Sequence, residues 1–402
     1  MKLGLISPRY GTEVVGGTEH WLRTLLEHLV ALRGWEAEVF TTCARSAATW
    51  ADEYPPGQET IGGVKVNRYR SRSGRDARYI HMLDDLRRDP EAMSQAVVDR
   101  YLRLVGPVCP DLIDAAADSD CDLVAVTPFL FWPSVQGVTR LGRRVVFHGA
   151  AHDEPELRLP VMADVFGAVG GFSFNSFSER DLVLGRFPVA HLPSVVVGNA
   201  VVEERGERAA LRPALGLEPD EPFVLCLGRV DRGKGAHLLT LMWDLYRRRH
   251  RDAPRLVFVG PVHEPLPAAS GVLAAGEQPE DIKWGALREC RLVVSPSAWE
   301  SFSLVVIEAW LADRAVVVNG RCGPTVEHCR RSGGGVWFDG YGDFEVAVER
   351  LLADDELRGA LAERGGVYAR REFSWEAVTA RYAGLAERIQ FSFPPNQSWG
   401  QR

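Results

Sequence analysis

The feature that most constrains the fold is an alternation of short β-branched strands with longer helical patterns along almost all of the 402 residues. The helical pattern at 18–32 is an example, because Trp21, Leu22, Leu25 and Leu29 fall on one face. Repetition of strand, helix and strand is typical of a parallel sheet covered by helices on both faces. The predicted strands are 2–7, 38–42, 64–69, 123–127, 144–147, 171–175, 194–197, 223–227, 255–259, 291–295, 315–319 and 335–338.

The alternation restarts after residues 203–222, which are rich in Glu, Arg and Pro and are interpreted as a connector. The chain is therefore predicted to be an α/β protein with two Rossmann-like, doubly wound parallel-sheet domains, residues 1–200 and 201–374. Further helical regions are expected at 76–105, 343–364 and 375–390. Ligands of such sheets bind at the carboxyl ends of the strands, and two facing sheets would form a deep cleft there.

Composition excludes several classes of function. The net charge of −7 gives no basic excess for nucleic acid. Seven cysteines, an odd number without a C-x-x-C pair, argue against a disulfide framework or a zinc site and favour a reducing compartment. We find no signal peptide and no apolar run long enough to span a membrane, so we expect a cytoplasmic protein with at most peripheral membrane contact. The basic cluster at 247–251 is interpreted as a solvated helix face.

Lysine is scarce, since only Lys2, Lys65, Lys234 and Lys283 are found among 47 basic residues. A lysine in a loop suited to chemistry therefore attracts attention. Lys234 belongs to such a loop, Leu227-Gly-Arg229-Val-Asp-Arg-Gly-Lys234-Gly235, between a predicted strand and helix. Glycines permit close backbone approach and a helix start attracts anions, so Arg229 and Lys234 suit a pair of phosphates. The alternative is a glycine-rich turn with solvated bases.

A second motif places Glu300 and Glu308 eight residues apart, in Pro-Ser-Ala-Trp-Glu-Ser-Phe-Ser-Leu-Val-Val-Ile-Glu-Ala. If the stretch were helical, the two carboxylates would be about 12 Å apart along the axis. Carboxylates accept hydrogen bonds from hydroxyl groups, and the backbone N–H groups of 301–303 would favour a diphosphate. A capping acid followed by an ordinary helical glutamate is the alternative.

Two further motifs follow predicted strands of the first domain. Gly16 and Gly17 lie in the segment 11–19, which lacks G-x-G-x-x-G spacing but would let the backbone approach a phosphate or sugar. His148 and His152 lie in 147–155, where histidine can donate to hydroxyls or stabilise charge. A flexible loop in the first case, and a metal site or a purely structural cluster in the second, are the alternatives.

Together and in this order, the four motifs resemble those of the retaining GT-B glycosyltransferases of family 4, which transfer sugars from nucleoside diphosphates. The resemblance covers nearly the whole chain. Glu300 and Glu308 match the family's E-x7-E motif, and Arg229 with Lys234 matches G-R-x-x-x-x-K-G. It also implies that the final helix packs back on the N-terminal domain, which would bind the acceptor.

The resemblance implies a role for each matched residue. Arg229 and Lys234 would clamp the diphosphate and stabilise the leaving group, in place of a metal, and no cofactor is expected besides the sugar nucleotide, a UDP- or GDP-sugar. Glu308 would hold the ribose and Glu300 the donor sugar. The remaining expected donor contacts are Ser301, Phe302, Ser303, Leu304, Gly16, Gly17 and, for the base, Gly276 and Gln278, while His152 would stabilise the transition state.

The chain departs from the family at Ser301 and Ser303, where E-G-F-G is common. The choice between His148 and His152 as the active histidine stays open, although His152 fits the family's placement better. The acceptor would be a hydroxyl of a small molecule, glycolipid or glycan, in natural-product or cell-surface biosynthesis. A sugar-nucleotide epimerase of the same shape and a catalytically silent sugar-nucleotide binder are the alternative functions.

Overall fold

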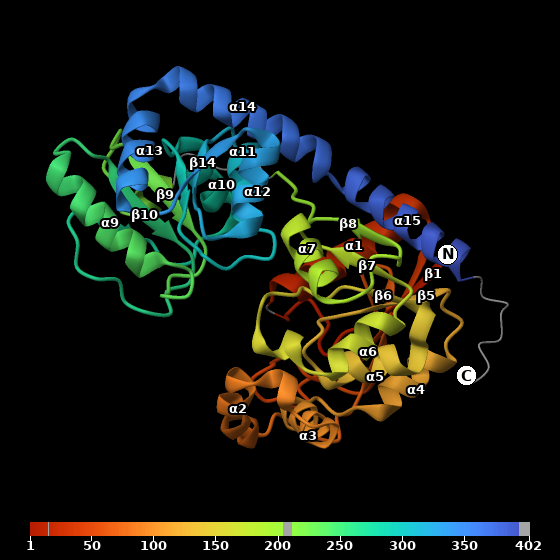
Figure 1. The fold of residues 1–402 in the computed structure, drawn as a ribbon. Helices are drawn as coiled ribbons and strands as arrows, with labels where there is room; N and C mark the ends of the chain where they lie inside the picture. The colour runs from red at the N-terminus through yellow and green to blue at the C-terminus, as the bar shows by residue number, and fades with distance from the viewer. Residues whose placement is uncertain (15, 204–210, 394–402) are drawn as a thin grey trace. The chain divides into compact units, whose positions relative to one another are not determined.

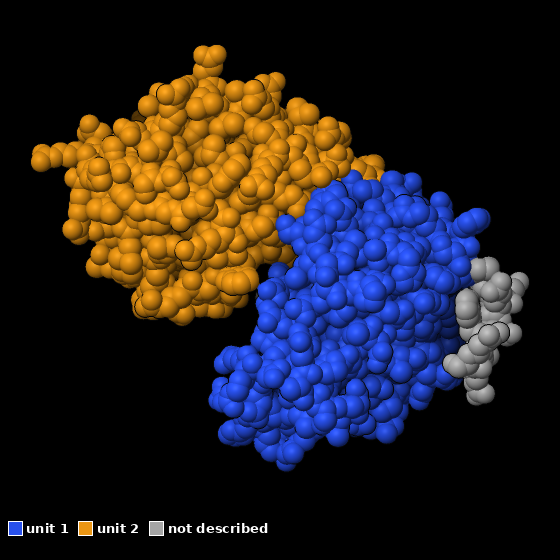
Figure 2. All heavy atoms as spheres, in the orientation of Figure 1, with its two compact units in different colours: residues 1–198, 378–402 blue, residues 199–377 orange. Residues whose placement is uncertain are grey.

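The computed structural model describes residues 1–14, 16–203 and 211–393, and the chain divides into two compact units. The first unit comprises residues 1–198 and 378–402, and the second comprises 199–377 (Figure 2). The sequence pattern places the corresponding boundaries at 200/201 and 374/375. Residues 204–210, which belong to the expected connector, lie outside the described residues.

The first unit is built on an eight-stranded sheet with the order β3-β4-β2-β1-β5-β6-β7-β8. Figure 1 labels β1, β5, β6, β7 and β8 of this sheet. Neighbouring strands are parallel except at the edge, where β3 runs antiparallel to β4. Because the strand order reverses at β1, the switch point lies between β1 and β5. The strands are β1 (Lys2–Ile6), β2 (Glu36–Thr42), β3 (Gly57–Ile61), β4 (Val64–Tyr69), β5 (Leu123–Val126), β6 (Val145–Phe147), β7 (Gly171–Phe174) and β8 (Ser194–Val196).

Helices connect these strands. Helix α1 buries Trp21, Leu22, Leu25, Leu26 and Leu29, as the periodicity predicts, and ends at Gly34 in the left-handed conformation. The helices of this unit are α1 (Gly17–Arg33), α2 (Leu83–Arg88), α3 (Gln95–Val105), α4 (Pro110–Asp118), α5 (Trp132–Leu141), α6 (Val161–Ala168) and α7 (Phe177–Arg186).

The second unit contains a six-stranded parallel sheet with the order β11-β10-β9-β12-β13-β14. Its strands are β9 (Phe223–Leu227), β10 (Arg255–Val259), β11 (Val272–Ala274), β12 (Val293–Ser295), β13 (Val316–Asn319) and β14 (Gly335–Phe338). The order reverses at β9, so the switch point lies between β9 and β12.

Both faces of this sheet are buried. Successive residues of β9 enter opposite cores: Phe223 and Leu225 pack with α10, α11 and α14, whereas Val224 and Cys226 pack with α9 and α13. The helices are α8 (Leu211–Leu215), α9 (Ala236–Arg249), α10 (Glu280–Glu289), α11 (Leu304–Leu311), α12 (Gly323–Ser332), α13 (Tyr341–Ala353) and α14 (Asp355–Glu372). The predicted α/β class with two doubly wound sheets is thus confirmed.

The last helix, α15 (Trp375–Ser392), contributes its residues from Val378 onward to the first unit. Tyr382 hydrogen-bonds His148 across 2.9 Å, and Arg381 and Arg388 donate to the carbonyls of Val197 and Ser194 at 2.8 and 3.1 Å. These contacts fasten the helix to β6 and to the end of the sheet at β8.

The sequence pattern misses some elements and merges others. The edge strands β3 and β11 are short and mostly exposed or half-buried, so they lack an apolar signature. The region 76–105 is not one helix, because Pro90 interrupts it and Asp89 caps a new 3₁₀ turn (Pro90–Ala92). The region 343–364 is divided at Asp354, whose side chain accepts a hydrogen bond from the N–H of Leu357 and starts α14.

Substitution by alanine should have opposite effects on stability at two glycines of α14, because their surroundings differ. A Cβ on Gly365 would lie 2.2 Å from Cδ1 of Trp310, which is fully buried and bonded to the carbonyl of Gly334, whereas a Cβ on Gly359 would meet nothing within 4 Å. We expect Gly365→Ala to destabilise the second unit by about 2 kcal/mol through overpacking. Gly359→Ala should stabilise it by about 0.5–1 kcal/mol through helix propensity. Urea denaturation measures both, and equal effects would contradict this packing.

The backbone conformation at the start of α11 predicts that one substitution there stabilises the protein. Ser303 precedes the helix with φ 75° and ψ 84°, a left-handed conformation that costs an L-residue about 1 kcal/mol. Ser303→Gly should therefore raise the free energy of unfolding by several tenths to about 1 kcal/mol, net of the entropy of glycine. Ser303→Ala, which keeps the Cβ, is the control and should not stabilise the protein. An equal gain in the alanine and glycine variants would show that relief of backbone strain is not the cause.

Candidate functional site

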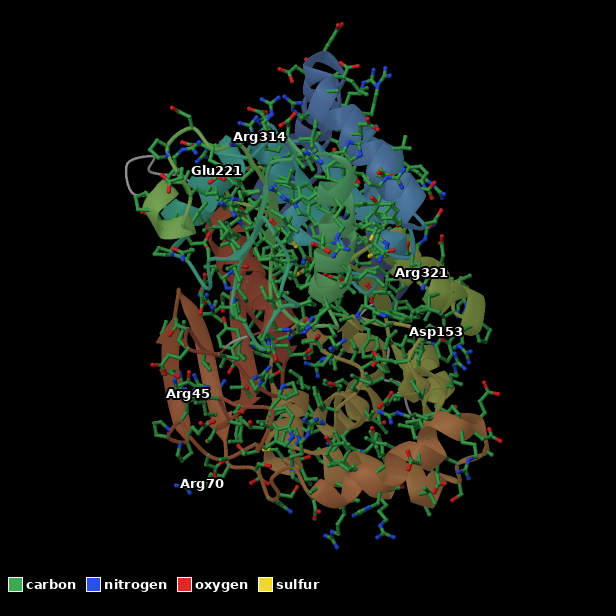
Figure 3. All side chains as sticks on the ribbon, turned by 90° about the vertical axis from the view of Figure 1, so that its left-hand side faces the viewer. Arg45, Arg70, Asp153, Glu221, Arg314 and Arg321 are labelled. Carbon is green, nitrogen blue, oxygen red and sulfur yellow. The ribbon has the colours of Figure 1, made fainter. Side chains whose placement is uncertain are left out.

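The polar motifs of the second unit meet at the carboxyl edge of its sheet, at the switch point. Strands β9 and β12 are parallel neighbours, so the loops 228–235 and 296–303 that follow them leave the same edge. Figure 3 labels Glu221 and Arg314, which precede strands at the opposite edge, and Arg321, which follows β13 at this edge.

Lys234 and Glu300 form an ion pair across this switch point, with Nζ and Oε1 2.8 Å apart. The two loops approach closely because Gly235, at φ 78°, has no side chain; a Cβ there would lie 2.6 Å from the carbonyl oxygen of Pro296. That carbonyl also accepts a hydrogen bond from Asn319 at the end of β13. The sequence motifs are therefore brought together by backbone packing, and the lysine and the carboxylate both remain partly exposed.

Asp231 organises the loop that carries the two predicted cations. Its carboxylate accepts a hydrogen bond from the backbone N–H of Lys234 at 2.7 Å and pairs with the guanidinium of Arg229. Burial raises the pKa of Asp231, but these two contacts outweigh it, so the pKa lies below its usual value. The sequence analysis did not assign a role to Asp231, although it stands within the quoted motif.

Glu308 lies on α11, and its partner was not anticipated. Lys283 of α10 reaches Oε1 of Glu308 at 3.1 Å and also contacts Glu280 at 2.6 Å. Burial raises the pKa of Glu308, which the nearby ammonium of Lys283 counteracts. The scarcity of lysine is the signal that could have singled out Lys283.

The segment between the two glutamates is only partly as expected. Helix α11 begins at Leu304 with Ser303 as its N-cap, so its free N–H groups belong to residues 303–306, whereas 301 and 302 precede the helix. Phe302 is turned into the core, 1% exposed, against His328 and Phe373. The neutral ring of His328 donates from Nε2 to the carbonyl of Phe302 at 3.0 Å, and burial lowers the pKa of this histidine to about 4. Ser301 lies in the loop, half-buried.

The residues expected near the base follow β11. Gly276 has φ 72° and its carbonyl accepts a hydrogen bond from the N–H of Gly260 at 2.8 Å. The side chain of Gln278 donates to the carbonyl of Ala275 at 2.6 Å. These two hydrogen bonds hold the loop in place, and the chain continues directly into α10, which carries Lys283.

In the first unit, Gly16 and Gly17 form the start of α1, after the loop that follows β1. Val15, which precedes them within the segment 11–19, lies outside the described residues. Gly17 has open space around its Cα, since an added Cβ would meet nothing within 4 Å. Arg9 forms an ion pair with Glu19 in the first turn. The backbone at this helix start is thus accessible on the side of Gly17.

The two histidines after β6 have different environments. His148 is buried between Trp21 and Tyr382, and burial lowers its pKa to about 3. His152 is half-buried in the following loop, next to Asp153, which Figure 3 labels. Because its ring is enclosed by the core, His148 contributes to packing. His152 is partly exposed and is therefore the better candidate for contact with a ligand.

Glu179 holds the loop that carries His152. This fully buried carboxylate accepts hydrogen bonds from the N–H groups of Ala151 and Asn175 at 2.9 and 2.7 Å. Burial raises its pKa to about 7 despite these bonds. Burial beside Glu156 likewise raises the pKa of Glu154 to about 7. Glu154 belongs to the segment 147–155 that the sequence analysis singled out, whereas Glu179 was not anticipated, because a single glutamate in a helix start has no distinctive pattern.

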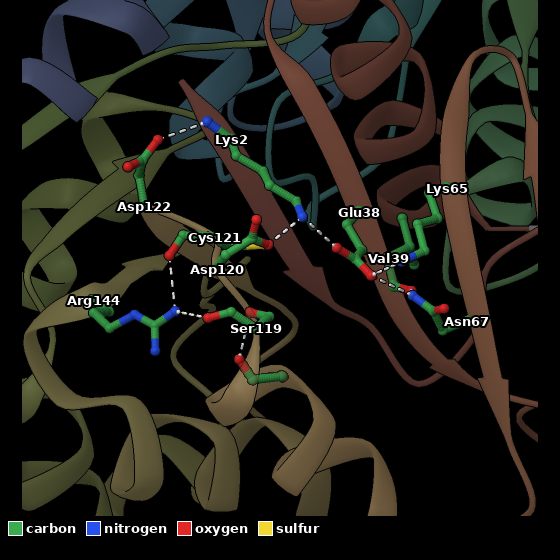
Figure 4. A network of polar contacts seen from close by, with 11 residues as sticks. Lys2, Glu38, Val39, Lys65, Asn67, Ser119, Asp120, Cys121, Asp122 and Arg144 are labelled. Carbon is green, nitrogen blue, oxygen red and sulfur yellow. Dashed lines mark hydrogen bonds and ion pairs between the residues drawn. The ribbon is translucent and has the colours of Figure 1, made fainter.

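In the described part of the chain, one group of side chains has the spacing of a metal site: Glu38, Asp120 and Cys121. Figure 4 shows that Lys2 lies among them, paired with Glu38 at 2.9 Å and with Asp120, while Lys65 pairs with Glu38 at 2.8 Å. An ammonium already balances these carboxylates, at the amino edge of the first sheet and away from the motifs. The seven cysteines are buried free thiols. Of the helices described, none has the length and apolar character needed to cross a bilayer.

Comparisons with known proteins concern the sequence and the fold. Residues 207–366 match the family described as Glycosyl transferases group 1. D-inositol 3-phosphate glycosyltransferase 1 of Catenulispora acidiphila is 29% identical over 276 residues, 62% of this chain and 65% of that protein. Alpha-D-kanosaminyltransferase of Streptomyces kanamyceticus is 30% identical over 221 residues, 50% of this chain and 54% of that protein. The matched regions thus span less than two thirds of either relative.

Solved structures with the same architecture include sucrose-phosphate synthase from Thermosynechococcus elongatus, with a TM-score of 0.68, 19% identity and coverage of 97% and 99% of the two chains. Anabaena HepE, in complex with UDP and glucose, gives a TM-score of 0.66 at 16% identity over 96% and 99%. At such identities the likeness establishes the fold. The two doubly wound units thus have the fold of these structures, and within the second unit residues 207–366 match the family described as Glycosyl transferases group 1.

Proposed function

We propose that the protein transfers a sugar from a nucleoside diphosphate sugar to a hydroxyl group of an acceptor, with retention of the anomeric configuration. The observation that carries this proposal is the meeting of Lys234 and Glu300 at the switch point of the second sheet. A cation suited to phosphate and a carboxylate suited to sugar hydroxyls lie within one hydrogen bond of each other there.

The donor would lie along the carboxyl edge of this sheet. Lys234 and Arg229 bind the diphosphate near the start of α11 at Leu304, where free N–H groups favour negative charge. Glu300 accepts hydrogen bonds from the donor sugar, aided by the backbone around Ser301 and Ser303. At the other end, Glu308 accepts those of the ribose, and the loop of Gly276 and Gln278 contacts the base.

The ion pair also explains how the two groups act together. The ammonium of Lys234 has three donors, so it can hold Glu300 with one and a phosphate oxygen with another. When the bond to the sugar breaks, negative charge develops on the diphosphate, and Arg229 and Lys234 stabilise it. These cations supply the charge that a divalent metal provides in other transferases, so we expect transfer without added metal.

The first unit is proposed to bind the acceptor. His152 donates to or stabilises charge on the reacting sugar, from a loop that Glu179 holds in place. The backbone of Gly16 and Gly17, which is open on the side of Gly17, would contact the diphosphate and the acceptor. Retention would follow from attack on the face of the leaving group, whose phosphate oxygen takes the proton of the acceptor hydroxyl.

UDP- and GDP-sugars are the donors we propose to test first. HepE was solved with UDP and glucose, and another structural neighbour, trehalose-6-phosphate synthase of E. coli, with UDP-2-fluoro glucose. Of the two relatives, the name of the D-inositol 3-phosphate glycosyltransferase supports a small polar acceptor, whereas the name kanosaminyltransferase refers to the transferred sugar. We propose such an acceptor in cytoplasmic biosynthesis of a natural product or a surface glycan.

The proposal is tested with a panel of nucleoside diphosphate sugars, first by thermal shift and then with acceptors, the product being analysed by NMR. We expect one donor to stabilise the protein and an α-linked product from an α-linked donor, formed in the presence of EDTA. Lys234→Ala and Glu300→Gln should each lower kcat/KM by about 100-fold or more, because each removes a contact that acts on the transition state.

Arg232→Ala is the matched control. Arg232 lies in the same loop but is exposed and pairs with Glu264 at 3.4 Å, so transfer should persist. Inverted product or full activity in both site variants would refute the proposal. Interconversion of a labelled donor without acceptor would indicate the epimerase, and tight binding without turnover across the acceptor panel would indicate the silent binder.

A further inference from the structure

The pair of Lys283 and Glu308 connects two parts of the donor site that the sequence motifs treat separately. Lys283 lies on the first turn of α10, directly after the loop with Gly276 and Gln278, whereas Glu308 lies on α11. The Nζ atom of Lys283 is 3.1 Å from Oε1 of Glu308. One side chain thus ties the base-side loop to the proposed ribose carboxylate.

Glu308 needs such a partner because its environment disfavours charge. Its side chain is only 14% exposed and that of Lys283 only 20%. A buried carboxylate without a cation takes up a proton, whereas a buried ion pair keeps it ionised when the geometry is good. Burial raises the pKa of Glu308, and Lys283 counteracts this shift in part. Burial disfavours the charged form of Lys283, but the carboxylates of Glu308 and Glu280 outweigh it and hold the pKa of Lys283 above its usual value.

The charges around this carboxylate are few. Lys283 and Glu280 act on it, both from α10, and Glu280 shares the ammonium at 2.6 Å from a more exposed position. On α14, which packs along α11, Arg370 contacts the carbonyl of Leu311 and Asp313 at the far end of the helix. Lys283 is therefore the cation that sets the state of Glu308.

The contact also leaves part of Glu308 available. It engages Oε1, and no described residue donates to Oε2. An ionised carboxylate held at one oxygen can accept the hydroxyl groups of a ligand with its remaining lone pairs.

We propose that Lys283 is a positioning residue of the donor site: it keeps Glu308 ionised and oriented to accept the ribose hydroxyls of the nucleotide. This inference rests on the proposed function, in which Glu308 binds the ribose. It adds that recognition of the ribose depends on a residue that need not touch the ligand.

The test compares nucleotides with and without ribose hydroxyls. The probes are UDP and 2′,3′-dideoxy-UDP, or the GDP pair if GDP stabilises the protein more, titrated calorimetrically from pH 5.5 to 9. The proteins are the full-length wild type, Glu308→Gln, Lys283→Met, Lys283→Arg and the control Arg288→Met. Arg288 is a basic residue of the same helix that pairs with Glu203, away from Glu308.

We expect the wild type to prefer the ribonucleotide, and Glu308→Gln to lose most of that preference. Lys283→Met should weaken UDP binding by about tenfold near neutral pH, a loss that corresponds to one hydrogen bond to a charged group. It should leave the binding of dideoxy-UDP unchanged. Its preference should recover toward high pH as Glu308 ionises, a dependence that loss of packing would not produce. Lys283→Arg and Arg288→Met should retain the wild-type preference.

Wild-type preference in Lys283→Met at every pH, beside a loss in Glu308→Gln, would overturn the role of Lys283 alone. Equal weakening of both nucleotides in Lys283→Met would assign the lysine to packing and would also overturn it. If the wild type binds neither nucleotide pair, the proposed function fails instead. Lys283→Arg keeps the charge, so the inference stays testable if the methionine variant does not fold.

Discussion

The ion pair between Lys234 and Glu300 is the interaction on which the candidate site depends, and it exists because two loops meet at a topological switch point. Strands β9 and β12 are neighbours although β10 and β11 come between them in the chain, so the loops that follow them converge. The approach requires Gly235 and the carbonyl of Pro296 to lie in contact. Asp231 then fixes the backbone of Lys234 and the side chain of Arg229.

The four lysines of this arginine-rich chain fall into two pairs, each beside largely buried carboxylates. Lys2 and Lys65 share Glu38 at the amino edge of the first sheet, where they stabilise the joining of strands. Lys234 and Lys283 meet Glu300 and Glu308 in the second unit. A compact ammonium can balance a carboxylate and still offer donors to a ligand, which suits a site whose charges must be shared with a substrate.

Much of the fold could be predicted from the sequence, because fully buried strands such as Val316–Asn319 have a continuous apolar signature. Strands β3 and β11 could not, since their exposed side chains follow no pattern. Of the site, the charged motif residues were found, but their partners were not. Lys283 and Glu179 act through tertiary contacts, and so does His328 of α12 at Phe302, whereas Asp231 acts within its own loop on side-chain and backbone groups that the motif does not reveal. Only the structure separates buried His148 from half-buried His152.

The central claim is that a nucleoside diphosphate binds at the carboxyl edge between β9 and β12. A crystal structure of the complete chain with UDP or GDP, whichever stabilises it more, tests this most directly. We predict the diphosphate within hydrogen-bond distance of Lys234 and Arg229 at the start of α11, with the ribose hydroxyls at Glu308. A nucleotide bound elsewhere, with the ion pair of Lys234 and Glu300 intact and no ligand beside it, would contradict this claim.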